Sequence, residues 1–239
     1  MDQSAKADTL RQFHLNPPIL VLPNAWDVAS AKKLAALPGC RALATTSAAV
    51  ARSLGWEDGE QAPVGEMLQT NGRIAAAVDV PVTGDLERGY GDPVGTARRA
   101  WEAGLVGINF EDSTGGDMVP IDEQVAAIRA IREAVPELVI NARVDVFLRE
   151  SGGIDEAVER AEAYLAAGAD CIYPIFCPVP TIADLARRID GPINVVVIPG
   201  TPEPHELQAL GVARMTWGAG LASLAYAEAV RVVAAALPT

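Results

Sequence analysis

The sequence predicts an α/β protein built as one (β/α)8 barrel of the TIM type, with an extra helix at its N-terminus. Short runs of β-branched residues alternate with alanine-rich amphipathic stretches from end to end, and eight such pairs fit into the chain. A length of 239 residues is normal for one such barrel. The alternative, a doubly wound sheet, usually carries a G-x-G-x-x-G turn after its first strand, and this chain has none there.

The elements are expected in a regular order along the chain. Residues Met1–Leu15 are predicted to form the extra helix. The eight strands are predicted at Ile19–Pro23, Ala42–Thr46, Val80–Asp85, Gly107–Glu111, Val139–Arg143, Cys171–Pro174, Ile193–Ile198 and Ala213–Trp217. The helices that follow them are predicted at Asp27–Ala36, Val64–Val78, Gly95–Ala103, Ile121–Ala134, Asp155–Ala167, Thr181–Ile189, Pro204–Leu210 and Gly220–Ala236. No linker interrupts this pattern, so residues 1–239 are expected to form a single domain.

The composition restricts the partners and the location of the protein. The formal net charge is −12, which would repel nucleic acid. No apolar run approaches 18 residues, and the first residues lack the basic and then apolar pattern of a signal peptide. We therefore expect a cytoplasmic protein that binds neither nucleic acid nor membranes. Its three cysteines form no C-x-x-C pair, and a disulfide framework is not expected.

Acidic side chains gather where the third and fourth predicted strands end. Asp85 and Glu87 are two residues apart and share one face of an extended chain, and Glu111 and Asp112 follow the next strand. The active site of a barrel lies at these carboxyl ends. Several carboxylates in one mouth repel each other unless a cation lies among them. Each acid alone could cap a helix or pair with an arginine, but the cluster favours a metal site.

The residues that are missing narrow the identity of the metal and the chemistry. The two histidines, His14 and His205, lie outside the predicted strand ends, so zinc and copper lack their usual ligands. An oxygen-ligated Mg²⁺ or Mn²⁺ remains. The lysines are Lys6, Lys32 and Lys33, and none lies at a strand end where a Schiff base would form. Any carbon–carbon chemistry must therefore use the metal to stabilise an enolate.

Other strand ends supply candidates for binding an anionic substrate. Arg143 can bind a carboxylate with two N–H groups, and an ion pair with Glu111 or Asp145 is a compatible alternative. The small residues Thr46–Ala49 can bring backbone N–H groups to an oxyanion. Asp58, in the loop after the second strand, either reaches the water shell of the metal or caps a turn.

Six motifs together resemble the isocitrate lyase/phosphoenolpyruvate mutase superfamily. They follow the order and spacing of that family over nearly the whole chain. The motifs are Leu22–Asp27 (LPNAWD), Thr45–Ala49 (TTSAA), Gly55–Gly59 (GWEDG), Pro81–Asp92 (PVTGDLERGYGD), Asn109–Asp112 (NFED) and Asn141–Asp145 (NARVD).

The resemblance implies a barrel in which Mg²⁺ holds a 2-oxo acid or its enolate while a C–C or P–C bond is made or broken. It implies that Asp85 binds the metal directly and that Asp58, Glu87 and Glu111 bind it through water, with Asp92 supporting the Gly-Tyr-Gly turn. Among these, Asp58 and Glu111 are expected to be catalytic together with Arg143. The expected substrate-binding residues are Trp26, Ser47, Ala48, Ala49, Arg143 and Asn194.

The chain also departs from the family at the loop after the fourth strand. The lyases carry a Lys-(Lys/Arg)-Cys-Gly-His run there, whereas Ser113–Pro120 contains no Lys, Cys or His. The phosphonate enzymes use a lid lysine and a histidine after the sixth strand, where this chain has Tyr173-Pro174. We interpret Asp112–Pro120 as a mobile lid or a plain surface loop. Tyr90, Ser113, Thr114 or Asp117 could replace the missing acid.

Three functions are compatible with these residues. The leading prediction is a Mg²⁺-dependent lyase that acts on a small 2-oxo or 2-hydroxy acid through an enolate, for example by decarboxylation. The alternatives are a mutase or hydrolase of phosphonopyruvate-like substrates, and a weakly active relative that binds 2-oxo acids. The resemblance also implies a homo-oligomer, a dimer or tetramer, often with exchange of the last barrel helix. Here that helix, Gly220–Ala236, nearly ends the chain and leaves little beyond it to cross a subunit boundary.

Overall fold

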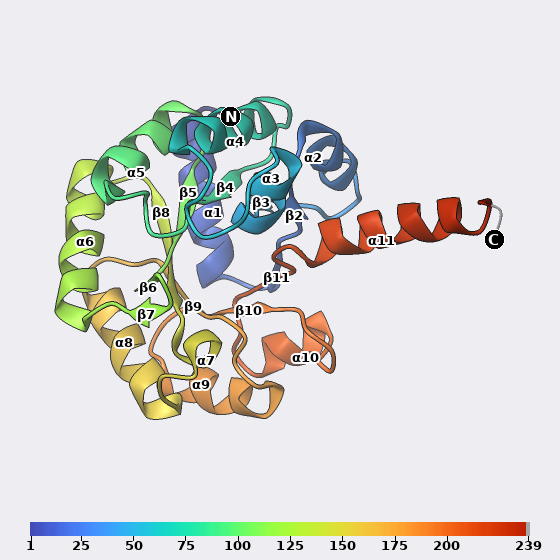
Figure 1. The fold of residues 1–239 in the computed structure, drawn as a ribbon. Helices are drawn as coiled ribbons and strands as arrows, with labels where there is room; N and C mark the ends of the chain where they lie inside the picture. Colours follow the sequence, from blue (N-terminus) through green and yellow to red (C-terminus); the bar gives the residue numbers. More distant parts are fainter. Residues whose placement is uncertain (238–239) are drawn as a thin grey trace.

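Parallel strands close into a barrel in the computed structural model, which describes residues 1–237 (Figure 1). The first strand consists of two segments, and β9 reaches β10 through a bridge between Ile172 and Ile193. The ring order is β2-β3-β4-β5-β8-β9, then β10-β11-β1. The strands are β1 (Leu20–Val21), β2 (Asn24–Ala25), β3 (Leu43–Thr45), β4 (Val82–Asp85), β5 (Gly107–Phe110), β8 (Val139–Val144), β9 (Cys171–Pro174), β10 (Asn194–Val196) and β11 (Arg214–Thr216). The predicted barrel and its strands are confirmed.

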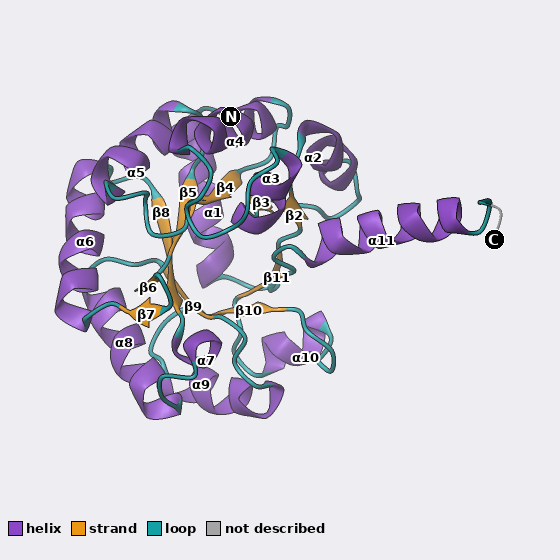
Figure 2. Cartoon of the chain, in the orientation of Figure 1, coloured by secondary structure: helices purple, strands orange, loops and turns teal. Residues whose placement is uncertain are grey.

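Helices surround the strands on the outside of the ring (Figure 2). Each predicted helix is present, and α1 (Gln3–Leu15) is the extra N-terminal one. The others are α2 (Val28–Ala35), α4 (Val64–Ala76), α5 (Pro93–Glu102), α6 (Ile121–Ala134), α8 (Ile154–Ala166), α9 (Ile182–Arg188), α10 (Pro204–Ala209) and α11 (Gly220–Ala234). Of the expected domain, 1–239, residues 238 and 239 lie outside the described part.

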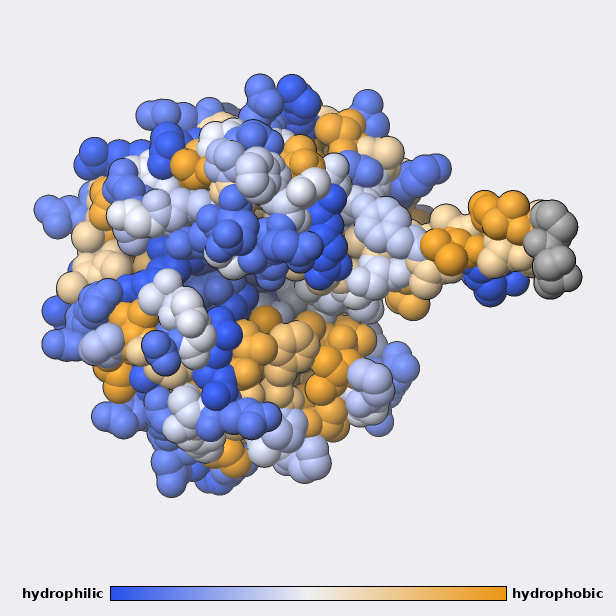
Figure 3. All heavy atoms as spheres, viewed as in Figure 1, coloured by the Kyte–Doolittle hydropathy of each residue, from blue (hydrophilic) through white to orange (hydrophobic). Residues whose placement is uncertain are grey.

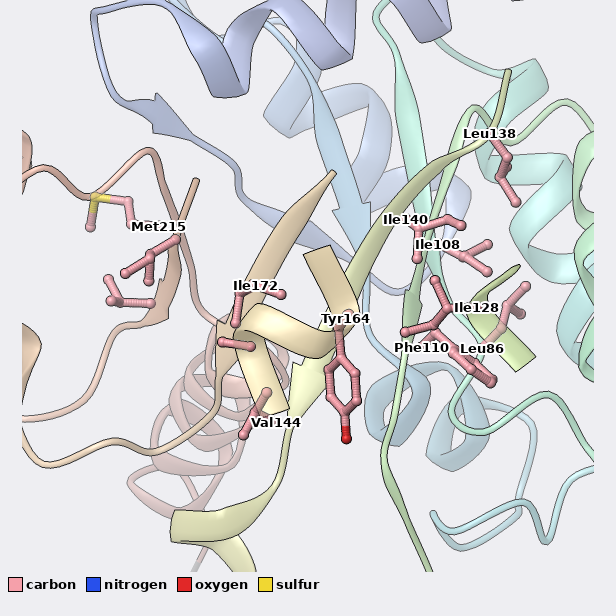
Figure 4. Packing of buried hydrophobic residues seen from close by; sticks show 14 of the residues in the cluster. Leu86, Ile108, Phe110, Ile128, Leu138, Ile140, Val144, Tyr164, Ile172 and Met215 are labelled. Atoms are coloured by element: carbon pink, nitrogen blue, oxygen red, sulfur yellow. The ribbon is translucent and has the colours of Figure 1, made fainter. Parts of the chain in front are cut away.

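The strand side chains alternate between the helices and the barrel interior. Ile108, Phe110 and Ile140 point outward and pack with Ile128 of α6 and Tyr164 of α8 (Figure 4). At the other end of the strands, a second cluster joins α1 to the strand starts and includes Ala7, Leu10, Leu20, Ala42, Val106 and Val139. Helix α1 therefore covers the amino-terminal end of the barrel, and the opposite end stays open.

Helix α11 behaves differently from the other helices, because it projects away from the barrel (Figure 1). Leu224 and Val230 are 67% and 68% exposed on it. Its first half contacts the barrel, and there Tyr226 meets Trp26 edge-on with ring centroids 6.2 Å apart. Beside it lies an apolar groove of about 440 Å³ lined by Val21, Leu34, Leu37, Cys40, Trp217 and Leu221. The sequence analysis expected little chain after this helix to cross a subunit boundary. In the structure, α11 itself extends away from the barrel.

Some short elements had no sequence prediction. These are α3 (Ser47–Ser53), α7 (Val146–Arg149), the 3-10 helix Val179–Thr181, and a hairpin of β6 (Ser113–Thr114) and β7 (Asp117–Met118). The hairpin occupies the segment interpreted as a lid. Within residues 1–237, no helix combines the length and the apolar character needed to cross a bilayer.

Candidate active site

The carboxyl ends of the strands surround a cavity of about 410 Å³. Its lining includes Asp85 at the end of β4, Arg143 of β8, Val196 and Thr216 at the ends of β10 and β11, and Ser47 of α3. Figure 3 shows the hollow near the centre of this face, with hydrophilic residues on one side and hydrophobic residues on the other. The cavity lies at the end of the barrel where barrel enzymes carry their sites.

Asp85 has one oxygen that is held and one that is free. Its Oδ2 accepts hydrogen bonds from the backbone N–H and the hydroxyl of Ser47, both at 2.9 Å. Its backbone N–H donates to Thr45 Oγ1 at 3.0 Å, which fixes the end of β4. Its Oδ1 is buried and has no hydrogen-bond partner within residues 1–237. A carboxylate oxygen with free lone pairs is the ligand that Mg²⁺ and Mn²⁺ prefer, so Oδ1 fits a cation.

Three further carboxylates, Asp58, Glu87 and Glu111, feel the charge of Asp85, and their surroundings disfavour the ionised form. Burial, together with the charges of Asp58 and Asp85, raises the pKa of Glu87 to about 7. Burial and then the charge of Asp85 raise the pKa of Asp58. Burial also raises the pKa of Glu111 well above its usual range, with Arg143 opposing the shift and Asp85 adding to it. A cation among these groups would offset both the repulsion and the desolvation.

The four acids do not form one compact ligand set. Asp58 and Asp85 line the main cavity, whereas Glu87 and Glu111 line a smaller cavity of about 50 Å³ under the β6–β7 hairpin. Across residues 1–237, no three His, Cys, Asp or Glu side chains converge closely enough to hold a metal ion between them. Direct contact from Asp85 and contact through water from the others is the arrangement that this spacing allows.

Glu87 is oriented by hydrogen bonds to both of its oxygens. The hydroxyl of Tyr90 donates to Oε1 and the backbone N–H of Glu60 donates to Oε2, each at 2.7 Å. The Glu60 carboxylate in turn accepts the backbone N–H of Tyr90 at 2.6 Å. The Tyr90 hydroxyl, one of the candidate acids, is thus already committed to Glu87.

The turn that follows Glu87 needs its glycine. Glu87 and Tyr90 have φ values of 51° and 55°, and Gly89 lies between them with φ 90°. A Cβ on Gly89 would come within 2.6 Å of the Cα of Pro93, so a side chain does not fit there. Asp92 accepts the backbone N–H of Gly95 at 2.9 Å and caps α5. Asp92 therefore supports the turn and the helix, as the sequence analysis expected.

Arg143 is held between two buried carboxylates. Its Nη1 pairs with Glu111, and its Nε and Nη2 donate to the two oxygens of Asp145 at 2.5 and 2.9 Å. These pairs are the alternative that the sequence left open for this residue. Because a guanidinium carries five N–H donors and Arg143 also lines the cavity, donors remain for a ligand.

A buried network behind Asp145 was missed by the sequence analysis. Asp112 is fully buried and accepts the hydroxyl of Tyr164 at 2.8 Å and the backbone N–H of Asp145 at 2.8 Å. Arg160 Nη1 lies 3.3 Å from the same carboxylate. Burial and the Asp145 charge raise the pKa of Asp112 to about 6. An arginine and a tyrosine four residues apart on the apolar face of α8 were the available signal.

The expected substrate-binding residues separate into two groups. Ser47, Ala48 and Arg143 line the cavity. Ala49 is fully buried inside α3, and Trp26 packs against Tyr226 instead of lining the cavity. Asn194 does not belong to the cavity lining, because it lies at the start of β10 and is fully buried, and this corrects the expectation for it. Val196 and Val197 line the cavity on that strand.

The expected lid is a short hairpin that is tied down at its base. The hydroxyl of Ser113 donates to Asp145, and Arg149 Nε donates to the same hydroxyl at 3.0 Å. Thr114 lines the smaller cavity, and Asp117 is exposed. Of the acids considered for this loop, Ser113 is thus bound to a carboxylate and Asp117 faces solvent.

Two walls of the main cavity differ in character. We call the side formed by Asp58, Asp85 and Arg143, together with the carboxylates Glu87 and Glu111 that line the smaller cavity, the acidic wall. The apolar wall is formed by Leu148, Ile175, Phe176, Val196, Val197 and Trp217, and the sequence analysis did not foresee it. Within the described chain, the cationic residues lining the cavity are Arg143 and the exposed Arg52.

Comparisons with known proteins cover nearly the whole chain. The family model of phosphoenolpyruvate phosphomutase matches residues 10–237. An uncharacterised protein of Mycobacterium tuberculosis is 37% identical over 215 residues, which are 87% of this chain and 82% of that protein. The 2-methylisocitrate lyase of Bacillus subtilis is 33% identical over 184 residues, which are 72% of this chain and 60% of the lyase. A crystal structure of a suggested phosphonomutase from Burkholderia cenocepacia J2315 is 37% identical, with a TM-score of 0.86 over 96% of this chain and 98% of that one.

Proposed function

Because this chain belongs to the isocitrate lyase/phosphoenolpyruvate mutase superfamily, we propose that it is a Mg²⁺- or Mn²⁺-dependent lyase of a small 2-oxo or 2-hydroxy acid. The curated relatives include 2-methylisocitrate lyases, a 2,3-dimethylmalate lyase and a phosphoenolpyruvate phosphomutase, and the chain is an enzyme of this lyase type. The metal, the substrate and the bond that breaks are the proposed part. The spacing of the carboxylates around Asp85 and the position of Arg143 support them.

One observation carries the metal part of the proposal. Asp85 Oδ1 is buried and has no partner in the described part of the chain, beside three carboxylates whose pKa values are raised. Asp85 would bind the cation directly, and Asp58, Glu87 and Glu111 would bind its water. When bound, the cation supplies positive charge that stabilises an enolate oxygen.

The chain's own groups would hold the acid and balance its charge. The unused N–H groups of Arg143 would bind the substrate carboxylate. The backbone N–H of Ala48, which lines the cavity, lies in the first turn of α3, where it has no acceptor in the helix, and Thr46 does not cap it. It would donate to an oxo-acid oxygen. In the decarboxylation of an oxaloacetate-like acid, the bond between C3 and its carboxyl group would break and CO2 would leave. The bonding electron pair would stay on C3 as the enolate of the 2-oxo group, and C3 would then take up a proton.

The test is a substrate panel with a metal-site control. We expect protein loaded with Mg²⁺ to release pyruvate or another 2-oxo acid from at least one small 2-oxo or 2-hydroxy acid. Asp85→Ala should remove this turnover, whereas Asp8→Ala, on an exposed aspartate of α1, should leave it unchanged. No turnover on any acid, with bound Mg²⁺ measured in the same sample, would overturn the lyase proposal.

The same panel separates the two alternatives. Phosphate release from phosphonopyruvate would indicate P–C chemistry. The lining of the cavity argues against it, since no lysine or histidine lines that cavity in the described chain. Tight, Mg²⁺-dependent binding of oxalate without turnover would indicate the binding-only relative.

We also propose that the chain forms a homo-oligomer in which α11 packs on a second copy. The exposed apolar residues of α11 and the apolar groove beside its start support this arrangement. Val230→Glu should reduce the mass measured by light scattering to that of a monomer. Leu15→Glu, on a leucine of α1 that is 59% exposed, is the matched control and should keep the wild-type mass. A wild-type monomer would contradict the proposal.

A further inference from the structure

The barrel interior contains a buried cation that the proposed reaction does not use. Arg214 is fully buried near the start of β11. Its Nε and Nη1 have no hydrogen-bond partner, and no acidic side chain in residues 1–237 lies within ion-pair distance. A guanidinium stays protonated in a protein, and an unpaired buried charge is costly. The unpaired charge of Arg214 therefore calls for a structural or functional explanation.

Arg214 reaches towards the floor of the cavity through Asn109. Its Nη2 lies 3.4 Å from Asn109 Oδ1, and Asn141 Nδ2 donates to the same oxygen at 2.7 Å. Asn109 is on β5, directly beside Asp85 in the register of the sheet. Asn109 lines the main cavity, whereas Arg214 and Asn141 do not.

These contacts fix which end of the Asn109 amide faces the cavity. A guanidinium carries donors only, so the Asn109 atom that faces Arg214 must be the acceptor Oδ1. The NH2 group then points to the other side, towards the cavity. No acceptor for Asn109 Nδ2 is found within residues 1–237, although the residue is only 6% exposed.

We propose that Asn109 is a substrate-binding residue whose amide N–H donates to an anionic oxygen, carboxylate or enolate, of the acid bound beside Asp85. Arg214 and Asn141 are positioning residues that hold the Asn109 amide so that its N–H donor faces the cavity. The guanidinium also polarises the amide, which strengthens the N–H group as a donor. The inference rests on the proposed function, because it needs an anionic oxygen next to the metal ligand.

The decisive variant is Asn109→Asp, which has nearly the same shape. One carboxylate oxygen can still accept from Arg214 and Asn141, so we expect the fold to persist. The other oxygen replaces a donor with a negative charge beside Asp85. Oxalate, a flat dianion that resembles the enolate of a 2-oxo acid, is the probe. Its affinity is measured by calorimetry at saturating Mn²⁺, and Mn²⁺ affinity is measured separately.

The affinities for oxalate and for Mn²⁺ should respond differently to Asn109→Asp. We expect Asn109→Asp to weaken oxalate binding by about tenfold or more, because a hydrogen bond to a charged group is lost and repulsion is added. Mn²⁺ affinity should stay unchanged or increase, because the added charge is negative. Asn16→Asp makes the same chemical change at an exposed site at the end of α1 and should alter neither. Arg214→Met should keep Mn²⁺ affinity and weaken oxalate binding less than Asn109→Asp.

Each outcome separates this inference from the proposed function. Equal oxalate affinity in wild type and Asn109→Asp would overturn the inference and leave the lyase proposal standing. A parallel loss of Mn²⁺ and oxalate affinity would assign Asn109 a structural role only and would also overturn it. Wild-type protein that binds Mn²⁺ but no oxalate would contradict the proposed ligand class, and the inference would fall with it.

Discussion

The two walls of the cavity are built from different strands and follow different rules. In the acidic wall, Ser47 holds Oδ2 of Asp85, and Glu111 and Asp145 hold Arg143, whereas Asp85 Oδ1 has no hydrogen-bond partner within residues 1–237. The apolar wall contains Ile175 and Val196, which pack with Tyr173 and Leu148 and offer no charge. The acidic wall therefore offers charge and hydrogen-bond donors to the proposed anion and metal, and the apolar wall offers apolar contact alone.

The difference between the two walls indicates a separate role for each, one in the reaction and one in the choice of ligand. Preorganised charges and donors act on the reacting part of a ligand. An apolar surface instead favours an apolar substituent, and it penalises a buried charge that has no partner. Under the proposed function, the acidic wall would carry the reaction and the apolar wall would select the substituent of the ligand.

The largest effect is expected from breaking the acidic wall at Arg143. Arg143→Met would leave Glu111 and Asp145 buried without their cation, which we expect to destabilise the fold by about 3–5 kcal/mol. Turnover should be lost as well, because the substrate carboxylate loses its partner. Urea unfolding at neutral pH measures the stability. Arg129→Met, at an exposed position on α6, is the control; a loss of under about 1 kcal/mol in Arg143→Met would show that the pairs are worth no more than surface pairs.

A second experiment tests the apolar wall with two ligands of similar length. With Mn²⁺ present, 2-oxo-4-methylpentanoate should bind about tenfold more tightly than 2-oxoglutarate, because the wall gains from buried methyl groups and has no partner for a second carboxylate. Ile175→Lys places an ammonium group in this wall and should reverse the order. Affinities come from calorimetry. A preference of the wild type for the diacid would mean that the exposed Arg52, or a residue outside the apolar wall, reads the second carboxylate.

The acidic wall was largely predictable from the sequence, and the apolar wall was not. Asp85, Glu87 and Glu111 follow β-branched runs, and the carboxyl ends of parallel strands meet at one end of a barrel. Their meeting follows from that rule alone. Val196 and Ile175 carry no such signal, because the same residue types fill the outward face of every strand. Only the observed strand bounds tell which of them points inward.

Asn194 illustrates how the sequence misleads at a strand. The predicted strand Ile193–Ile198 was correct, but a motif match placed Asn194 in the mouth of the barrel. Because residues two apart share a face, Asn194 and Val196 both point inward, and Val196 is nearer the carboxyl end. The position along the strand therefore decides which of the two inward-facing residues reaches the cavity. The inward orientation of Arg214 could not be predicted for a similar reason, since a single arginine in a strand gives no sign of which face of the sheet it occupies.

The balance of charge in the acidic wall can be tested by pH. The pKa of Glu87 is raised to about 7, so the folded protein binds more protons than the unfolded chain between the usual glutamate pKa of 4.5 and 7. Metal-free protein should therefore lose stability, on the order of 2 kcal/mol, as pH rises through this window. Glu87→Gln should reduce this slope, and Asp112, with a pKa of about 6, should keep part of it. Urea unfolding at pH 5 and 7.5 gives the answer; a stability that rises with pH in the metal-free protein would contradict it.

The smallest effect is expected from removing one hydrogen bond at the edge of the acidic wall. Tyr90→Phe deletes the hydroxyl that donates to Glu87 Oε1, while the Glu60 N–H still holds Oε2. That hydroxyl lowers the pKa of Glu87, so its loss should move the pKa upward. At neutral pH a larger share of Glu87 is then protonated, and Mn²⁺ should bind about three- to tenfold more weakly. Above pH 9, where Glu87 is ionised in both proteins, the difference should shrink. A loss of affinity that is equal at all pH values would mean that Tyr90 acts on the shape of the turn and not on the charge of Glu87.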